Sequence, residues 1–181
     1  MEKNLEIAVF GGGCFWCTEA IFTRLRGVES VQSGYAGGHT DNPSYEQVSM
    51  GRTGHAEAIQ IEFDPSIIKF TNLLNVFFAT HDPTTLNRQG NDVGEQYRSA
   101  VFYTSDEQKK DAKEFIKKLE DDETYDDPVV TEVTKLNKFW PAESYHQRYY
   151  ELNENKPYCQ IVINPKIAKL RAKFAPLLKP E

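Results

Sequence analysis

Hydrophobic side chains recur along the chain in two periods, every second residue in some stretches and every third or fourth residue in others. The two-residue period predicts strands at residues 5–10, 28–35, 55–63, 97–103 and 129–133. In the third of these strands Glu57 shares its face with Ile59, Ile61 and Phe63. A carboxyl group on the apolar side of a strand singles this position out.

Helices are predicted between the strands. Apolar spacing and end signals place them at residues 18–26, 71–79, from 105 onwards, 142–152 and 167–174. Gly27 ends the first helix, and Ser105 with Gln108 has the form of a capping box at the start of the third. Strands that alternate with helices predict an α/β (α+β) fold with a split β-α-β core.

Two polar, turn-rich segments interrupt this alternation, at residues 40–54 and 81–96. We expect them to be long functional loops, because loops held on a rigid scaffold often carry binding and catalytic residues. Tyr45, Asp92 and Tyr97 lie in or beside these segments. Each of them alone is more often structural, yet phenol hydroxyls can also anchor a polar oxygen of a substrate.

Composition limits the classes to which the protein can belong. The 181 residues, 39% of them hydrophobic, suffice for one folded domain, which we expect to span residues 1–181. The formal net charge of −6 and the lack of a basic cluster argue against a nucleic-acid partner. No apolar run reaches the roughly 18 residues of a membrane span. Residues 1–4 lead into a strand rather than a signal peptide, so we expect a cytoplasmic protein.

Residues 11–17 join the first predicted strand to the first helix, and they contain three glycines and then two cysteines that flank two aromatics. Glycines let the backbone turn sharply, and the free N–H groups of a helix start lower the pKa of a cysteine. Cys14 is therefore the candidate nucleophile, with Phe15 and Trp16 as an apolar wall beside its sulfur. Alternatively, all three residues belong to the core, as an isolated cysteine usually does.

Cys17 follows Cys14 by three residues, which brings two sulfurs close together on a helix. Three cysteines fit poorly with a disulfide-stapled domain, so a CxxC pair is either redox-active or metal-binding. Zinc needs about two further ligands. Cys159 and the four histidines form no second paired motif, so we expect no metal. Cys159 itself is either a packed core residue or a redox partner.

Glu57 is the candidate acid. Burial would disfavour its charged form and raise the pKa of its carboxyl group. A carboxylic acid that stays neutral at pH 7 can donate a hydrogen bond or a proton, which would make Glu57 catalytic beside Cys14. The alternative is that Glu57, at the start of its strand, reaches water as most glutamates do.

Five stretches in this order resemble the peptide methionine sulfoxide reductase A family over nearly the whole chain. They are residues 13–16 (GCFW), 33–38 (SGYAGG), 53–57 (TGHAE), 92–99 (DVGEQYRS) and 142–147 (AESYHQ). The resemblance implies a ferredoxin-like core with added helices. It also implies reduction of the S epimer of methionine sulfoxide, free or in oxidised proteins.

The same resemblance assigns a course to the reaction. Cys14 attacks the sulfoxide sulfur while Phe15 and Trp16 hold the methyl group of the substrate. Methionine leaves, Cys14 becomes a sulfenic acid, and a second thiol condenses with it to an intramolecular disulfide. Thioredoxin then reduces the disulfide by exchange, and no cofactor is bound.

The resemblance further implies a site for the sulfoxide oxygen. Glu57 binds this oxygen as the proton source, together with the hydroxyl groups of Tyr45 and Tyr97. Asp92 supports the site.

The sequence departs from the best-known family pattern at its other cysteines. Cys17 lies inside the first motif, and a Gly-rich tail with cysteines is missing at the C-terminal end. Proximity to Cys14 favours Cys17 as the resolving thiol, whereas the resemblance favours Cys159, which falls near the position of a tail cysteine. Both stay candidates, with a slight preference for Cys17.

Two other functions fit parts of this sequence. A general CxxC thiol-disulfide oxidoreductase shares the strand–CxxC–helix arrangement, but it has no need of Glu57, Tyr45 and Tyr97. A non-enzymatic module would bind methionine-rich segments through Phe15 and Trp16.

Overall fold

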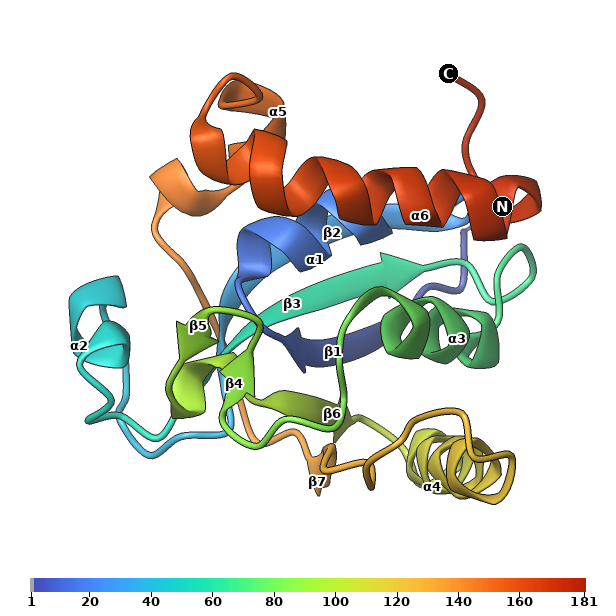
Figure 1. Ribbon diagram of the computed structural model, residues 1–181, viewed down its shortest axis with the longest axis horizontal. Helices are drawn as coiled ribbons and strands as arrows, with labels where there is room; N and C mark the ends of the chain where they lie inside the picture. The colour runs from blue at the N-terminus through green and yellow to red at the C-terminus, as the bar shows by residue number, and fades with distance from the viewer. Residues whose placement is uncertain (1) are drawn as a thin grey trace.

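The computed structural model describes residues 2–181 and has a mixed α/β fold around a curled central sheet (Figure 1). In spatial order the strands are β7 (Glu132–Lys135), β6 (Ser99–Tyr103), β1 (Glu6–Gly12), β3 (Ala56–Phe63), β2 (Val28–Ala36) and β8 (Phe139–Pro141). Neighbouring strands are antiparallel, except for the parallel pair β6 and β7. The predicted alternation of strands and helices is confirmed.

The longer helices pack against this sheet and form the main core with it. They are α1 (Phe15–Phe22), α3 (Phe70–Thr80), α4 (Asp106–Asp121) and α6 (Asn164–Phe174). Helix α1 contacts β2, β3 and α6, so it lies between the sheet and the C-terminal helix (Figure 1). Both sides of α1 are therefore covered, and seven of its eight residues are buried.

Strand β3 has the predicted parity. Ile59, Ile61 and Phe63 have no exposed surface and belong to the main core, whereas Ala56 and Ala58 belong to a smaller cluster on the other face. Glu57 is on the side of the main core and is 2% exposed. Of the two alternatives for Glu57, the one in which it reaches water from the start of its strand is therefore wrong.

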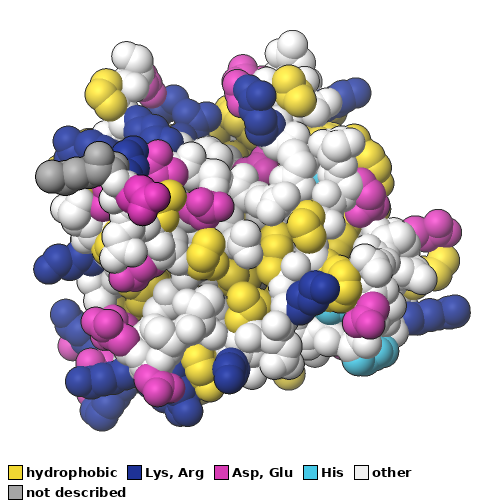
Figure 2. Space-filling view, turned by 180° about the vertical axis from the view of Figure 1, so that it is seen from behind, with side chains coloured by type: hydrophobic (Ala, Val, Ile, Leu, Met, Phe, Trp, Pro, Cys, Tyr) yellow, Lys and Arg dark blue, Asp and Glu magenta, His cyan; other side chains and the backbone are white. Residues whose placement is uncertain are grey.

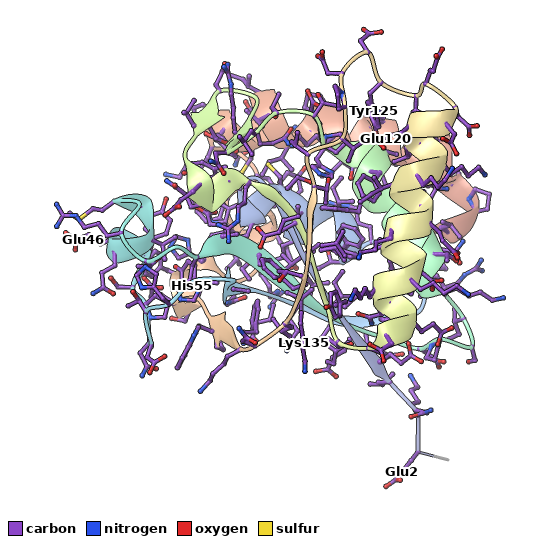
Figure 3. All side chains as sticks on the ribbon, turned by 90° about the horizontal axis from the view of Figure 1, so that it is seen from below. Glu2, Glu46, His55, Glu120, Tyr125 and Lys135 are labelled. Carbon is purple, nitrogen blue, oxygen red and sulfur yellow. The ribbon has the colours of Figure 1, made fainter. Side chains whose placement is uncertain are left out.

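The two polar segments contain short regular elements that the sequence pattern did not indicate. Segment 40–54 includes α2 (Tyr45–Ser49), which begins with a capping box. Segment 81–96 includes a small hairpin of β4 (Arg88–Gln89) and β5 (Asp92–Val93), followed by a turn of 3-10 helix at Glu95–Tyr97. In Figure 3, Glu46 of α2 and His55 lie on the opposite side of the molecule from Glu120 and Tyr125 at the end of α4.

Several predicted boundaries are wrong for local reasons. The helix predicted at 18–26 runs from Phe15 to Phe22, and the Thr23 hydroxyl donates to the Glu19 carbonyl just past its end. The strand predicted at 97–103 starts only at Ser99, and the one predicted at 129–133 starts only at Glu132.

The helix predicted at 142–152 is divided into a 3-10 turn at Ser144–His146 and α5 (Tyr149–Leu152). Arg148 between them has a left-handed backbone with φ +54°, which a continuous helix cannot contain. The break turns the chain, and α5 then packs against α1.

Strand β8 was not predicted at all. It pairs with β2, where Gly34 lies opposite Pro141. A Cβ atom on Gly34 would lie 2.3 Å from both Phe139 Cζ and the Trp140 carbonyl oxygen, so only glycine leaves room for this strand.

The C-terminal segment folds back onto the end of α1. Leu178 forms an isolated antiparallel bridge with Leu25, and the Lys179 N–H donates to the Arg24 carbonyl at 2.9 Å. The Arg26 N–H also donates to the Leu177 carbonyl at 2.8 Å, so backbone hydrogen bonds join two segments that are more than 150 positions apart in the chain.

The surface mixes residue types. Figure 2 shows the face behind that of Figure 1, where hydrophobic side chains lie in small groups between charged and uncharged polar ones. No helix within residues 2–181 has the length and apolar character needed to cross a membrane.

Candidate active site

Cys14 stands at the junction of β1 and α1, as predicted. Gly13 before it has φ +92°, and a Cβ atom there would lie 2.6 Å from Gln89 Cγ, so the turn requires glycine. Cys14 is the N-cap residue of α1, and its carbonyl accepts from the Cys17 N–H at 3.0 Å. This bond starts the helix three residues earlier than the apolar pattern indicated and puts both cysteines on its first turn.

The expected lowering of the Cys14 pKa is wrong. Cys14 is 8% exposed, and burial raises the pKa of its thiol, helped by a hydrogen bond with Cys17 and by the negative charge of Glu57. A hydrogen bond from the Trp16 backbone acts in the opposite direction but is the smaller effect. The same bond with Cys14 lowers the pKa of Cys17, so the two thiols share one ionisation and Cys17 is the more acidic partner.

Glu57 faces this pair. Its Oε1 accepts a hydrogen bond of 3.1 Å from the Phe15 N–H at the first turn of α1. Burial raises the Glu57 pKa to about 8, so the carboxyl group is mostly protonated at neutral pH. With Oε1 engaged as an acceptor, Oε2 is left to carry the proton.

Tyr45 and Tyr97 lie near Glu57 and Cys14, although they come from α2 and from the turn before β6. Burial raises the pKa of both phenols, and the Glu57 and Cys14 charges raise them further. Both hydroxyls are therefore uncharged donors at neutral pH. The structure thus brings the three groups predicted to bind the sulfoxide oxygen into one region.

Trp16 is held between aromatic neighbours. Its ring stacks on Tyr149 with centroids 3.7 Å apart and meets the Tyr158 ring edge-on at 5.8 Å. Its indole N–H donates to His146 Nδ1 at 3.1 Å. Phe15, in contrast, has no exposed surface, so Trp16 presents more of the apolar wall than Phe15 does.

His146 is a residue of this site that sequence reasoning missed. It is 1% exposed, and burial lowers its pKa, so the ring is neutral. Since Nδ1 accepts from Trp16, the proton is on Nε2, which is buried and has no hydrogen-bond partner among the described residues. The ring lies 4.4 Å from that of Tyr45 and 5.1 Å from that of Phe15, centroid to centroid.

Glu143 was also missed, although it lies in the fifth motif. Its carboxylate accepts from the Tyr35 hydroxyl at 2.9 Å and from the Tyr45 backbone N–H at 3.1 Å. Burial works to raise the Glu143 pKa, but these hydrogen bonds lower it overall, so the group is charged. Glu143 thereby fixes the start of α2 and the direction of Tyr45.

Asp92 reaches the site through Tyr158, a third residue that was missed. The Tyr158 hydroxyl donates to Asp92 Oδ2 at 3.0 Å and lies 3.6 Å from Cys17 Sγ. Cys159 follows at the start of a π-helix at Cys159–Ile163, where it has no exposed surface. The only sequence signal for a role of Tyr158 in the site is its position directly before Cys159.

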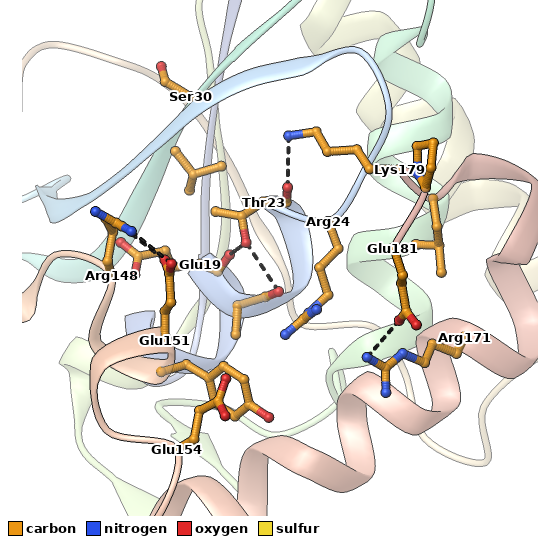
Figure 4. Close-up of a pocket in the computed structure, with 15 residues that line it drawn as sticks. Glu19, Thr23, Arg24, Ser30, Arg148, Glu151, Glu154, Arg171, Lys179 and Glu181 are labelled. Carbon is orange, nitrogen blue, oxygen red and sulfur yellow. Dashed lines mark hydrogen bonds and ion pairs between the residues drawn. The ribbon is translucent and has the colours of Figure 1, made fainter.

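A cavity lies on another part of α1, lined by Glu19 and Ala20 of that helix. It measures about 640 Å³ and shares none of the predicted site residues. Figure 4 shows its charged lining, in which Arg148 pairs with Glu151 at 2.7 Å and Arg171 with Glu181 at 2.9 Å.

Over residues 2–181, no group of three or more His, Cys, Asp or Glu side chains is arranged to hold a metal ion.

A thiol pair on a helix start, beside a carboxyl group with a raised pKa and an aromatic wall, is an arrangement typical of an oxidoreductase. The model of the family described as "Peptide methionine sulfoxide reductase" matches residues 6–177. The chain belongs to this family, as the five motifs indicated, and catalyses methionine sulfoxide reduction of the MsrA type.

Curated relatives extend over almost the whole chain. A peptide methionine sulfoxide reductase MsrA of Chromobacterium violaceum is 54% identical over 175 residues, which are 97% of this chain and 99% of the relative. One from Acinetobacter baumannii (strain AYE) is 55% identical over the same shares of both chains.

Solved structures of the same kind are similar in fold. Reduced Mxr1 from Saccharomyces cerevisiae has a TM-score of 0.78 at 32% identity and covers 86% of this chain and 89% of its own. Methionine sulfoxide reductase A of Corynebacterium diphtheriae has a TM-score of 0.76 at 32% identity, over 84% of this chain and 77% of its own.

Proposed function

We propose that this chain reduces the S epimer of methionine sulfoxide, free or in oxidised proteins, and that Cys14 is the nucleophile. The observation that carries the proposal is the buried Cys14 thiol beside a carboxyl group, Glu57, whose raised pKa keeps it protonated at neutral pH. Cys14 attacks the sulfoxide sulfur, and the S–O bond breaks as the oxygen is transferred to Cys14. The thiol proton ends on that oxygen, so thiol and sulfoxide become sulfenic acid and methionine.

Around this step the proposed roles follow the contacts. The Glu57 Oε2–H donates to the sulfoxide oxygen, as the Tyr45 and Tyr97 hydroxyls do, and these bonds strengthen as the oxygen gains charge. Phe15 and Trp16 hold the methyl group. A methyl group in such a wall contributes about 0.8 kcal/mol through burial alone, so the polar donors carry the larger share.

Cys17 is the resolving thiol in this proposal. It shares a hydrogen bond with Cys14 on the same helical turn, and this bond lowers its pKa. Its thiolate attacks the Cys14 sulfenic acid, which gives a Cys14–Cys17 disulfide and water. Cys159 is the alternative: the charge of Cys17 contributes to the raised pKa of Cys159, and Cys159 falls near the position of the family's tail cysteines.

Thioredoxin is the proposed reductant of this disulfide, with no bound cofactor. Mxr1 has been solved in complex with Trx2, which supports a partner of that type for the family.

Residues 1–181 would act as one catalytic domain. We also propose a ferredoxin-like description of its core, supported by the strand order β6-β1-β3-β2 with α1 and α3 as the connections.

Thioredoxin-coupled NADPH oxidation with each epimer of methionine sulfoxide tests the proposal. We expect turnover with the S epimer and loss of turnover in Cys14→Ser. No turnover of the S epimer by the wild type would refute it. Disulfide reductase activity without any sulfoxide would favour a general oxidoreductase, and binding without turnover would favour a methionine-binding module.

A further inference from the structure

The Tyr158 hydroxyl links a thiol and a carboxyl group from different parts of the chain. It lies 3.6 Å from Cys17 Sγ on α1 and 3.0 Å from Asp92 Oδ2 in β5. The phenol ring stands edge-on to Trp16, which fixes its direction. Three different parts of the chain thus meet at one oxygen atom.

The hydrogen bonds around this oxygen have a definite direction. A phenol has one hydrogen, and an ionised carboxylate can only accept, so Tyr158 donates to Asp92. The phenol oxygen is then free to accept, and the Cys17 S–H is the donor of the second bond. The order is thiol, phenol, carboxylate, which is the order in which a proton would leave Cys17.

Cys17 needs such a route, because it is 2% exposed and has almost no access to water. Asp92 is half-buried and can pass a proton on to solvent. A buried thiol must ionise before it can attack, since the thiolate is the nucleophile.

We propose that Asp92, acting through Tyr158, takes the proton of Cys17 as Cys17 closes the disulfide with Cys14; this rests on the proposed function. The thiol proton moves to the phenol oxygen while the phenol proton moves to Asp92. The thiolate attacks Cys14 Sγ, the S–O bond breaks and hydroxide leaves. The hydroxide takes up one proton and Asp92 returns one to solvent, so thiol and sulfenic acid become disulfide and water.

The charges around Cys17 allow this role to be separated from a simple electrostatic one. Besides Cys14, Tyr158 and Asp92, the titratable and charged groups that face it are Lys166 on α6, Glu57 on β3 and Cys159. The positive charge of Lys166 favours the thiolate, whereas the negative charge of Asp92 disfavours it. If Asp92 acted only through its charge, it would therefore hinder the ionisation of Cys17. If Asp92 accepts the proton, it promotes that ionisation.

The test uses Tyr158→Phe and Asp92→Asn in the full chain, with Tyr150→Phe as the matched control. Like Tyr158→Phe, Tyr150→Phe removes one phenol hydroxyl, which donates to Asn164 at the start of α6. This hydroxyl is not among the hydrogen bonds that connect Cys17, Tyr158 and Asp92. Reduced protein is mixed with one equivalent of methionine-S-sulfoxide and no reductant. Methionine formed reports the sulfoxide step, and loss of free thiols with dimedone trapping reports the disulfide step.

We expect Tyr158→Phe and Asp92→Asn to slow the disulfide step at least about tenfold beyond any change in the sulfoxide step, with trapped sulfenic acid accumulating. In Tyr158→Phe the pH midpoint of the disulfide step moves upward, because the Cys17 S–H has lost its acceptor and the thiolate must form without the relay. Tyr150→Phe should match the wild type in both steps.

Three results would overturn the relay. They are an unchanged disulfide step in Tyr158→Phe, an accelerated one in Asp92→Asn, and an equal slowing in Tyr150→Phe. Each leaves the proposed function standing, because methionine is still formed in the first turnover. If the wild type formed no methionine, the proposed function would be refuted instead. Methionine is measured separately from the loss of thiols, so the two failures can be distinguished.

Discussion

The Glu57 carboxyl group accepts a hydrogen bond of 3.1 Å from the Phe15 N–H. This bond joins strand β3 to the first turn of α1, where Cys14 and Cys17 lie. Because Oε1 is used for this bond, the remaining oxygen has a fixed direction. The bond thus ties the acid directly to the helix turn that follows Cys14.

Replacing Glu57 tests how its proton is used. Glu57→Gln keeps a neutral donor and should retain most of the activity at neutral pH, whereas Glu57→Ala should lower kcat/KM about 10²- to 10³-fold, the usual loss for one such donor. Steady-state kinetics with the S epimer measure both. Equal losses in the two variants would mean that the proton is transferred to the substrate rather than shared with it.

The raised pKa of Glu57 also predicts a pH-dependent stability. A carboxyl group that titrates near 4.5 when unfolded and about 8 when folded binds its proton more tightly in the folded state. Its stabilising contribution is complete below that lower value and is lost as pH rises to about 8. Glu19, with a pKa raised to about 7 by burial, acts in the same direction.

We therefore expect the wild-type Tm to fall between about pH 5 and about pH 8, and to fall less in Glu57→Gln, which cannot ionise. Thermal unfolding of both proteins across this range is the measurement. Parallel curves would show that Glu57 does not stay protonated in the folded state.

Serine substitutions distinguish the two candidate resolving thiols. With Cys17 as the resolving thiol, Cys17→Ser should form about one methionine per chain and then stop recycling with thioredoxin, because its sulfenic acid has no nearby partner. Cys159→Ser should recycle normally. The reverse result would assign the role to Cys159, and normal recycling in both variants would mean that neither thiol is uniquely required.

His146 is expected to position Trp16. His146→Phe keeps an aromatic ring but leaves the Trp16 indole N–H without its acceptor, so we expect KM to rise several-fold with a smaller change in kcat. The chain has two tryptophans, so in a Trp140→Phe background the fluorescence reports Trp16 alone. An unchanged Trp16 spectrum and KM would contradict this role.

Gly34→Ala should destabilise the fold by about 1–3 kcal/mol or more, because its methyl group would overlap with Phe139 and the Trp140 carbonyl. Urea unfolding measures the loss. The displaced β8 is followed by Glu143, so the variant should also lose activity beyond what its unfolded fraction explains. Wild-type stability would mean that β8 can shift without cost.

The sequence predicted the parts of this molecule that depend on local pattern. Glu57 was identified because strand parity alone puts it with Ile59 and Ile61. Cys14 was identified because glycines and a helix start have recognisable residue preferences.

The missing parts depend on contacts between distant segments. The Tyr158 hydroxyl contacts Cys17 Sγ because the C-terminal part of the chain packs against α1. Glu143 accepts from the Tyr35 hydroxyl because β8, just before it, pairs with β2. The Cys14 pKa was predicted in the wrong direction for the same reason, since burial by distant residues outweighs the effect of the local helix start.

The return of the C-terminal segment to α1 has a practical consequence. Leu178 and Lys179 bond to the end of the helix that begins at Cys14. A tag, fusion partner or resin attached after Glu181 would therefore pull on the helix of the two thiols. For a biosensor or immobilised catalyst made from this chain, an attachment point away from residue 181 leaves this contact undisturbed.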